Sequence, residues 1–262
     1  MLTHSNMAFA LVTGASTGIG RDLAKICAGA GYDVIAVARN RAQLETLASE
    51  IMTTYRRQVR IVVKDLSRSE APVELFSELA DLHSQVELLI NNAGVGMLGF
   101  FADLDAEKQM EMLRLNVDAL TCVTRLFVPA MIARRKGYVL NVASTAAFQP
   151  GPLMAVYYAS KAYVVSFSSA LHNELKEQGV VVTALCPGPT QTEFQRRARM
   201  EATPLFRGAV MDSITVARIG FDAMMRGKPL VVAGRLNGLM AFLTRFAPRQ
   251  MAASMARRMQ EV

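Results

Sequence analysis

The sequence predicts an α/β fold in which one parallel sheet is covered by helices on both faces. Short apolar runs alternate along the chain with longer segments of helical periodicity, which is typical of β–α–β units. The apolar runs are continuous, without alternation of polar and apolar residues, and such strands are buried on both faces. We therefore expect a doubly wound sheet of about seven mainly parallel strands.

The elements follow one another in order along the chain. The expected strands lie at residues 8–12, 33–38, 59–63, 86–90, 138–142, 180–185 and 230–233. The expected helices lie at residues 18–30, 41–54, 69–82 and 156–178. Because no repeat, linker or low-complexity stretch interrupts the series, we expect a single domain over residues 1–262. We expect its core at about residues 7–233 and a C-terminal amphipathic helical extension at about 235–262.

Composition excludes several classes of protein. With 52% hydrophobic and 19% charged residues, the chain has enough apolar surface to fold, which excludes disorder as a description of the whole. No window approaches the roughly 20 apolar residues of a membrane-spanning helix, and the polar start at residues 1–6 does not resemble a signal peptide. Cys27, Cys122 and Cys186 are widely spaced, which indicates reduced thiols in a cytoplasmic protein. No carboxylate cluster indicates a metal site.

The net charge of +7 is concentrated at one end of the chain. Residues 193–262 hold 12 basic and 5 acidic residues and therefore carry the whole excess, while residues 1–192 are neutral. The neutral main part and the absence of Trp argue against a nucleic-acid partner. The basic tail indicates either attraction to an acidic surface or membrane, or a solvated face of arginines.

A glycine-rich turn follows the first expected strand. Three glycines there allow a tight turn, close approach of the backbone to phosphate oxygens, and close packing of helix on strand. The N-terminus of the following helix offers free N–H groups and a positive dipole end to a pyrophosphate. The spacing G-x-x-x-G-x-G at the first β–α junction predicts a Rossmann-type dinucleotide site, with cofactor contacts from Gly14, Ser16, Thr17, Gly18, Ile19 and Gly20.

The end of the second strand bears on the choice between NAD and NADP. An acidic residue about 20 positions after the glycines would bind the ribose 2′-hydroxyl of NAD, and the chain has none there. Arg39 stands at this point instead, and a planar guanidinium suits a 2′-phosphate. The sequence therefore favours NADP(H) over NAD(H), although Arg39 could also be the first cation of a solvated helix start.

A Tyr–Lys pair at the start of the long helix carries the candidate chemistry. Tyr157 and Lys161 are four residues apart and so share one helix face. A free tyrosine has a pKa near 10, and a nearby ammonium lowers it, so the pair suits proton exchange with a carbonyl oxygen during hydride transfer. Ser144 ends the preceding strand and can bind the same oxygen, and Asn116 is a polar residue in an apolar helix.

Taken together, these motifs resemble the short-chain dehydrogenase/reductase family over about residues 7–195. The resemblance implies that Tyr157 is the general acid–base and that Ser144 orients the carbonyl. It implies as well that Lys161 lowers the tyrosine pKa and binds the nicotinamide ribose, and that Asn116 holds a relay water. It also implies further cofactor contacts, from Asp65, Leu66, Asn92, Ala93, Gly94, Pro187, Gly188, Thr190 and Thr192. One departure is Thr17, which stands where many NADP-using relatives carry a basic residue.

The predicted function is therefore NADP(H)-dependent interconversion of a carbonyl and an alcohol. Apolar residues are expected to flank the nicotinamide end, which favours an apolar substrate. These residues are 94–97, 148–150 and Phe194. A mobile lid is expected at about residues 193–211. The alternative is a non-catalytic NADP(H)-binding sensor or scaffold. An epimerase or dehydratase is disfavoured by chain length and glycine spacing.

The C-terminal segment and the resemblance to the family both bear on what the protein contacts. Apolar residues at helical spacing in the tail indicate core, an oligomer interface, a peripheral membrane contact or a cap over a lipid-like substrate. They are Leu236, Leu239, Met240, Leu243, Phe246, Met251, Met255 and Met259. The resemblance also implies a homodimer or homotetramer, built through the helices at about 119–135 and 156–178.

Overall fold

A computed structural model describes residues 8–198, 200–201, 203–204 and 210–261, and its centre is a seven-stranded sheet. The strand order is β3-β2-β1-β4-β5-β6-β9, and every neighbouring pair is parallel. The strands are β1 Phe9–Thr13, β2 Asp33–Ala38, β3 Val59–Val63, β4 Val86–Asn91, β5 Gly137–Val142, β6 Val180–Cys186 and β9 Leu230–Val232. The order reverses between β1 and β4, which is the switch point at which doubly wound sheets bind ligands. The predicted fold class is confirmed.

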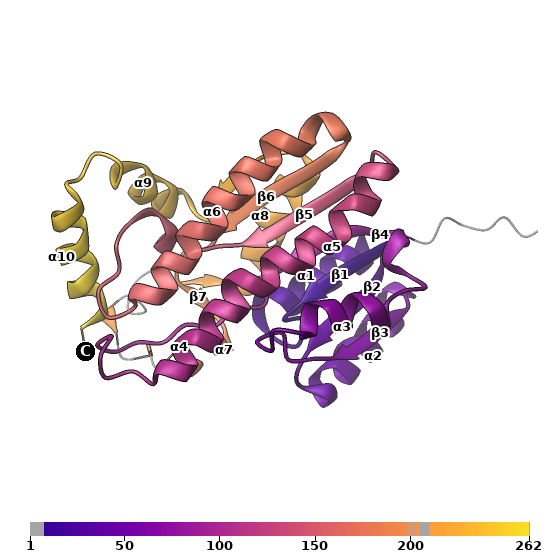
Figure 1. The fold of residues 1–262 in the computed structure, drawn as a ribbon, viewed down its shortest axis with the longest axis horizontal. Helices are drawn as coiled ribbons and strands as arrows, with labels where there is room; N and C mark the ends of the chain where they lie inside the picture. The colour runs from indigo at the N-terminus through magenta and orange to yellow at the C-terminus, as the bar shows by residue number, and fades with distance from the viewer. Residues whose placement is uncertain (1–7, 199, 202, 205–209, 262) are drawn as a thin grey trace, which may run out of the picture.

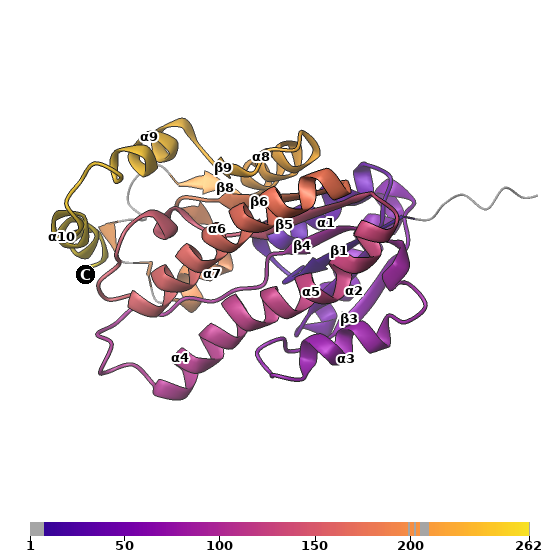
Figure 2. The same ribbon diagram turned by 45° about the horizontal axis from the view of Figure 1, so that its top comes forward.

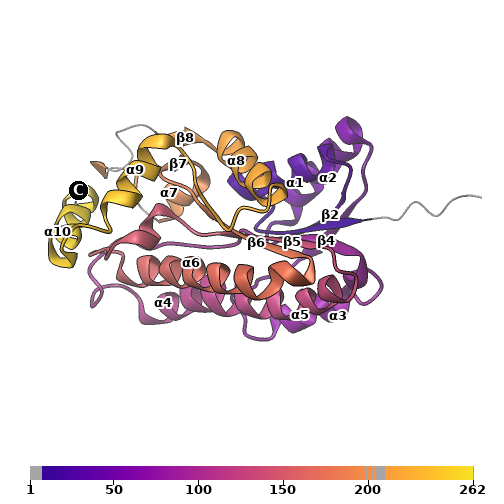
Figure 3. The same ribbon diagram turned by 90° about the horizontal axis from the view of Figure 1, so that it is seen from above.

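Helices cover both faces of this sheet, as Figure 3 shows with the sheet edge-on. One face carries α1 Gly18–Gly29, α2 Arg41–Tyr55 and α8 Ser213–Met225. The other carries α3 Ala71–Glu78, α4 Ala106–Leu113, α5 Leu120–Ala133 and α6 Ala155–Leu175. Short 3₁₀ segments lie at η1 His83–Gln85, η3 Thr145–Phe148 and η4 Lys176–Gln178.

The core is divided by the sheet into two clusters. Successive side chains of a strand point to opposite faces, so Ala10 and Val12 of β1 pack with α1 and α2, whereas Leu11 packs on the other face with α5. All residues of β1, β2 and β4 are buried, which agrees with their continuous apolar sequences. The rigid sheet places the carboxyl ends of the strands side by side.

Several boundaries differ from the sequence prediction. The helix expected at 69–82 is the shorter α3, and the helix expected at 156–178 ends at Leu175. The pattern did not place α4, α8 or a two-stranded parallel ribbon of β7 Thr190–Gln191 and β8 Met211–Asp212. Strands of two residues are too short to give a periodic signal. The start of α8 is marked by Asp212, whose carboxylate accepts a hydrogen bond from the Thr215 amide at 2.8 Å.

One helical stretch corrects the expectation about membrane-spanning windows. Residues 106–133 form a continuous helix that contains an 18-residue window of mean hydropathy 1.4, which meets the length and composition of a spanning helix. Part of this apolarity has a place in the fold, because 44% of the window is buried and Val123 and Phe127 pack against the sheet.

The C-terminal segment forms two helices at one end of the molecule, α9 Arg235–Leu243 and α10 Arg249–Gln260 (Figures 1 and 2). No residue of α9 is buried. Helix α10 buries Ala252, Ala256 and Gln260. The expected lid begins with α7 Glu193–Arg197, and its residues 199, 202 and 205–209 lie outside the described part of the chain.

Candidate active site

A cavity of about 1360 Å³ opens at the carboxyl ends of the strands. It runs from the glycine turn after β1, past the ends of β2, β4, β5 and β6, to the inner sides of α9 and α10. Of the predicted catalytic and cofactor residues, all but Gly20 and Asn116 line this cavity. The structure therefore brings the predicted residues into one site.

The glycine turn leaves no room for side chains. Gly14 and Gly18 have φ angles of +66° and +54°, which L-residues with a Cβ rarely adopt. A Cβ on Gly20 would lie 2.3 Å from the Asn92 Nδ2 atom and 2.3 Å from the Gly14 carbonyl oxygen. This bare backbone at the start of α1 is the geometry that a pyrophosphate requires, and the cavity thus fits a dinucleotide.

Asn92 fixes the turn from the end of β4. Its side-chain amide donates to the Thr13 and Gly14 carbonyl oxygens at 3.0 and 3.1 Å. In return, the Thr13 hydroxyl accepts from the Asn92 and Ala93 amides at 3.0 and 3.1 Å. Sequence reasoning did not assign this role to Thr13. Its signal was a hydroxyl residue at the end of an apolar strand.

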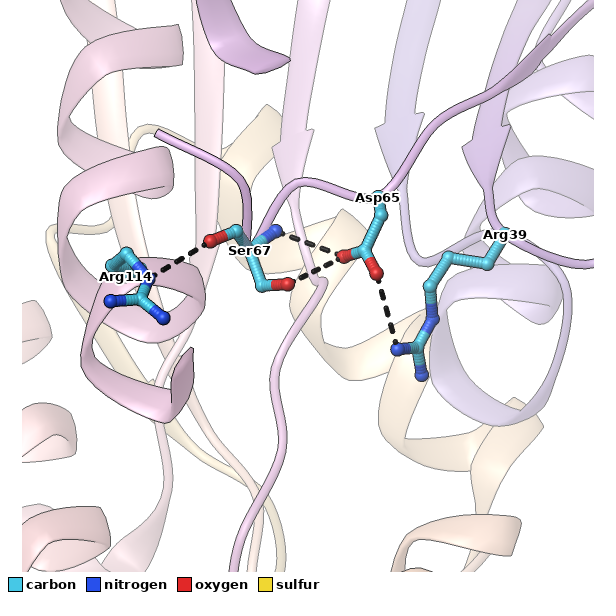
Figure 4. Close-up of polar contacts among 4 residues, drawn as sticks. All are labelled: Arg39, Asp65, Ser67 and Arg114. Atoms are coloured by element: carbon cyan, nitrogen blue, oxygen red, sulfur yellow. Dashed lines mark hydrogen bonds and ion pairs between the residues drawn. The ribbon is translucent and has the colours of Figure 1, made fainter. Parts of the chain in front are cut away.

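The far end of the cavity is formed by Arg39 and Asp65 (Figure 4). The Arg39 Nη1 atom lies 3.5 Å from the Asp65 Oδ2 atom, and the Arg39 side chain is 61% exposed. Burial alone would raise the pKa of Asp65, but hydrogen bonds from the Ser67 amide and hydroxyl and the Arg39 charge hold this pKa below its usual value. The Arg114 Nε atom donates to the Ser67 carbonyl oxygen at 3.2 Å and fixes this loop.

The Tyr157 hydroxyl lies in a strongly desolvated position. Burial raises the pKa of Tyr157 well above its ordinary value, while a hydrogen bond with Ser144 lowers it and the nearby Tyr158 raises it. The Ser144 hydroxyl also accepts from the Ala146 amide at 3.1 Å, which caps η3. Burial thus dominates the Tyr157 pKa, contrary to the sequence-based expectation of a net lowering by the lysine.

Lys161 is almost fully buried behind the tyrosine. Its Nζ atom donates to the Val142 carbonyl oxygen at 2.9 Å and lies 5.8 Å from the centre of the Tyr157 ring. Burial lowers the pKa of Lys161 to about 8, against a smaller opposing effect of Cys186. The helical spacing of four residues therefore makes Tyr157 and Lys161 neighbours, as the sequence predicted.

Asn116 lies in a π-helical turn, Arg114–Ala119, between α4 and α5. Its Oδ1 atom accepts from the Val95 amide at 3.0 Å, and its Nδ2 atom donates to the Val95 carbonyl oxygen at 2.9 Å and the Ser160 hydroxyl at 3.1 Å. A Cβ on Gly94 would lie 3.2 Å from Asn116 Oδ1 and 3.3 Å from Lys161 Nζ. Such π-turns recur at functional sites, and the sequence gave no sign of this one.

The expected substrate side is only partly right. Gly94, Val95, Gly96, Gln149 and Phe194 line the cavity, and the Phe194 ring centre lies 5.4 Å from that of Tyr157. The cavity lining does not include Met97, Phe148 or Pro150. Met97 faces a separate small pocket, and Phe148 packs on a core cluster with Cys186.

One lining residue was missed by sequence reasoning. Tyr158, which lacks a lysine four residues on, lines the cavity beside Tyr157. Its hydroxyl accepts a hydrogen bond from the Gln260 side chain of α10, and its ring lies so close to Gly151 that a Cβ there would be 2.2 Å from Tyr158 Cγ. No local pattern relates residues 102 positions apart, so this contact had no sequence signal.

This arrangement defines a class of protein. A glycine turn at the switch point of a parallel sheet, opening toward a buried Tyr, Ser and Lys, is the site of a dinucleotide-dependent oxidoreductase. A family model described as short chain dehydrogenase matches residues 8–203. The chain belongs to the short-chain dehydrogenase/reductase family.

Relatives and solved structures agree with this membership. The very-long-chain 3-oxoacyl-CoA reductase of Anas platyrhynchos is 32% identical over 219 residues, which cover 81% of this chain and 68% of that protein. The inactive hydroxysteroid dehydrogenase-like protein 1 of Homo sapiens is 32% identical over 182 residues, 68% of this chain and 54% of that protein. The short-chain dehydrogenase from Sphingobium yanoikuyae in complex with NADPH has a TM-score of 0.82 at 28% identity and covers 95% of this chain and 100% of that one.

The family membership establishes the general activity. The chain is an NAD(P)-dependent oxidoreductase that acts between CH–OH and C=O groups, and its cofactor is a nicotinamide dinucleotide.

Proposed function

We propose that the protein interconverts an apolar carbonyl compound and its alcohol with NADP(H), and that Tyr157 is the general acid–base. One observation carries this proposal. The Tyr157 side chain is buried, with Ser144 beside its hydroxyl and Lys161 behind its ring, at the point where the dinucleotide part of the cavity meets its apolar part.

The nicotinamide, when bound, supplies or accepts the hydride. Because burial keeps the Tyr157 phenol protonated near neutral pH, this group is suited to donate a proton to the carbonyl oxygen as negative charge develops there. The Ser144 hydroxyl binds the same oxygen and orients it. The Lys161 ammonium binds the nicotinamide ribose and favours the phenolate that remains after proton donation.

Asn116 supports this proton path from the π-turn. Both N–H groups of its amide and one acceptor site of Oδ1 are engaged with Val95 and Ser160. The second acceptor site of Oδ1 is the one that a relay water toward Lys161 would use.

The test of the acid–base role is Tyr157→Phe. We expect kcat for NADPH-dependent reduction of apolar ketones to fall about 10²–10⁴-fold, the usual contribution of a general acid, while NADPH affinity stays within about twofold. Tyr163→Phe is the matched control, because Tyr163 is on the same helix but outside the cavity lining. A Tyr157→Phe variant with wild-type turnover refutes the role.

The preference for NADP(H) is assigned to Arg39. Its ion pair with Asp65 is long and exposed, and such pairs contribute little, so the guanidinium can bind a 2′-phosphate at small cost. We expect Arg39→Ala to lower NADPH affinity about 10–100-fold, the range of a charge-assisted hydrogen bond, and to leave NADH affinity unchanged. Arg41→Ala serves as the control, since Arg41 does not line the cavity. Equal losses for both cofactors would contradict the assignment.

The second candidate function is a non-catalytic dinucleotide sensor or scaffold. A relative whose name describes it as inactive favours keeping this alternative. Tight NADPH binding without oxidation or reduction of any compound in a panel of aldehydes, ketones, quinones and alcohols would support it over the enzyme.

We further propose that the protein is cytoplasmic and contacts an anionic membrane surface through α9. Leu239 and Phe242 are about half exposed and do not line the cavity, and Arg245 follows them. Apolar side chains beside arginines bind anionic interfaces. We expect vesicles of mixed anionic lipid to sediment the protein, and a Leu239→Ser, Phe242→Ser double variant to lose this binding. Equal sedimentation of both proteins refutes the contact.

A further inference from the structure

The cavity continues beyond the reacting groups into a second lobe. This lobe, here called the chain lobe, is walled by α9 and α10. Its large apolar wall residues are Leu236, Met240, Leu243, Phe246, Met251, Met255 and Met259. We propose that the substrate bears a long flexible apolar chain and that this chain lies in the chain lobe. This inference rests on the proposed carbonyl reduction.

The chemistry of the wall selects an apolar ligand. From residue 235 onward, Arg235 is the one charged residue among the described residues that line the cavity. The arginines of α10 at positions 249, 257 and 258 do not belong to the lining. Helix α10 is therefore amphipathic, with its thioether face toward the lobe and its guanidinium face away from it.

The side chains of the wall also favour a flexible ligand. Four of these seven wall residues are methionines, whose unbranched, polarisable side chains adapt to ligands of variable shape. Met251, Met255 and Met259 remain about half exposed, so their apolar surface is available for a ligand to cover. An alkyl chain would bury it along its length.

The dimensions of the lobe point to a chain of many carbons. Met251 and Met259 are eight residues apart on α10 and both line the cavity, and a rise of 1.5 Å per residue separates them by about 12 Å. Met154, Phe194 and Met200 continue the lining from the chain lobe to Tyr157. A small ketone held at Tyr157 leaves this length of apolar wall without a contact.

The wall is anchored to the active site. The Gln260 side chain donates to the Tyr158 hydroxyl, next to Tyr157 in the sequence, and Gln260 is 1% exposed. Ala252 and Ala256 are buried on the same side of α10. The Arg257 guanidinium lies 5.8 Å from the centre of the Phe100 ring. These contacts hold α10 at a fixed distance from the reacting groups.

The test is a chain-length series of straight-chain methyl ketones, from 2-butanone to 2-dodecanone, with NADPH. We expect kcat/KM to rise about threefold to fourfold for each added methylene that enters the lobe, the factor that corresponds to burial of one CH₂. A compact fused-ring ketone of equal carbon number should be a poorer substrate than 2-dodecanone. Rates that are independent of chain length, or a preference for the fused ring, overturn the proposal while leaving carbonyl reduction intact.

A variant localises the effect. Met255→Trp fills the chain lobe, and we expect it to lower the ratio of kcat/KM for 2-dodecanone to that for 2-butanone at least tenfold. Met52→Trp is the matched control, because Met52 is exposed on α2 and outside the cavity lining, and it should leave the ratio unchanged. An unchanged ratio in Met255→Trp also overturns the proposal.

A binding measurement separates this inference from the proposed activity. If the protein reduces no carbonyl at all, the proposed function fails, and the chain lobe is then tested with a fluorescent dodecanoyl probe in the presence of NADP⁺. Binding that Met255→Trp weakens at least tenfold, and Met52→Trp does not, supports the chain lobe. Absence of probe binding to the wild-type protein overturns it.

Discussion

The two ends of the cavity are built on opposite principles. At the dinucleotide end, glycines at positions 14 and 20 meet Asn92 so closely that a single Cβ would collide, and the supporting strands are fully buried. At the other end, α9 buries no residue and α10 buries three, while large apolar side chains stay exposed. The first end is closely packed, and the second is open and adaptable.

This difference corresponds to the two ligands. The dinucleotide is the same molecule in every turnover, so a preorganised cradle binds it with little loss of conformational freedom in the protein. A substrate with a flexible chain differs in shape from one molecule to the next, and methionines accommodate such variation. We therefore expect substitutions in the closely packed end to lower stability or cofactor affinity more than substitutions in the open end.

The largest effect is expected for Gly20→Ala. The added methyl group would lie 2.3 Å from the Gly14 carbonyl oxygen, a backbone atom that cannot move without opening the turn. Overpacking costs about 1–3 kcal/mol and occasionally more, and because the clash here is with backbone we expect the upper end of this range, a fall in cofactor affinity of about 100-fold. Fluorescence titration with NADPH measures it. Gly238→Ala is the control, because a Cβ on Gly238 meets nothing within 4 Å, and equal affinities in the two variants would refute the rigid cradle.

A smaller effect is expected from the buried charge of Lys161. Its folded-state pKa of about 8 is below the ordinary value of 10.5, so between these values the unfolded chain binds more protons than the folded chain. Stability should therefore rise with pH across this window and decline as pH falls through about 8. The shift corresponds to about 3 kcal/mol at most.

The measurement compares the wild-type protein with Lys161→Met by urea unfolding at about pH 7.5 and pH 10.5. The unfolding free energy of the wild type minus that of Lys161→Met should be larger at pH 10.5 than at pH 7.5. The buried Cys27 thiol, whose pKa burial raises to about 12, contributes with the opposite sign, but it is common to both proteins and cancels. A difference that is constant or moves the other way contradicts the prediction.

The smallest effect is expected on α9. Leu239→Ala removes a side chain that is 53% exposed, and such surface changes stay within about 0.5 kcal/mol of unfolding free energy. Leu47→Ala is the matched core variant, since Leu47 on α2 is fully buried, and its cost should be about 2–5 kcal/mol. Chemical denaturation measures both. Comparable losses would contradict the difference in packing between the sheet-covering α2 and the exposed α9.

Sequence reasoning placed the sheet and most of the site because both depend on local patterns. Continuous apolar runs define buried strands, glycine spacing defines the turn after β1, and a four-residue spacing joins Tyr157 to Lys161. These signals are contained within a few neighbouring residues. Their positions at the carboxyl ends of parallel strands then follow from the topology.

The features that were missed depend on contacts between distant residues. The Gln260–Tyr158 hydrogen bond joins two helices, and the π-turn at Asn116 arises inside a helix whose sequence shows no break. The pKa of Tyr157 depends on desolvation by the whole site, which no spacing rule measures. The tail was predicted as an apolar helical segment, with a cap over a lipid-like substrate as one of several alternatives. The contact of Gln260 with Tyr158 is what relates it to the cavity.

The shallow seating of α10 also has a consequence for how such proteins diverge. Its buried contacts are two alanines and one glutamine, so its cavity-facing methionines can be exchanged without disturbing the sheet or the glycine turn. Residues 235–260 therefore form one contiguous segment in which the proposed chain lobe can change independently of the catalytic groups. Substitutions confined to this stretch would reshape the proposed chain lobe and leave the glycine turn, Tyr157 and Lys161 in place.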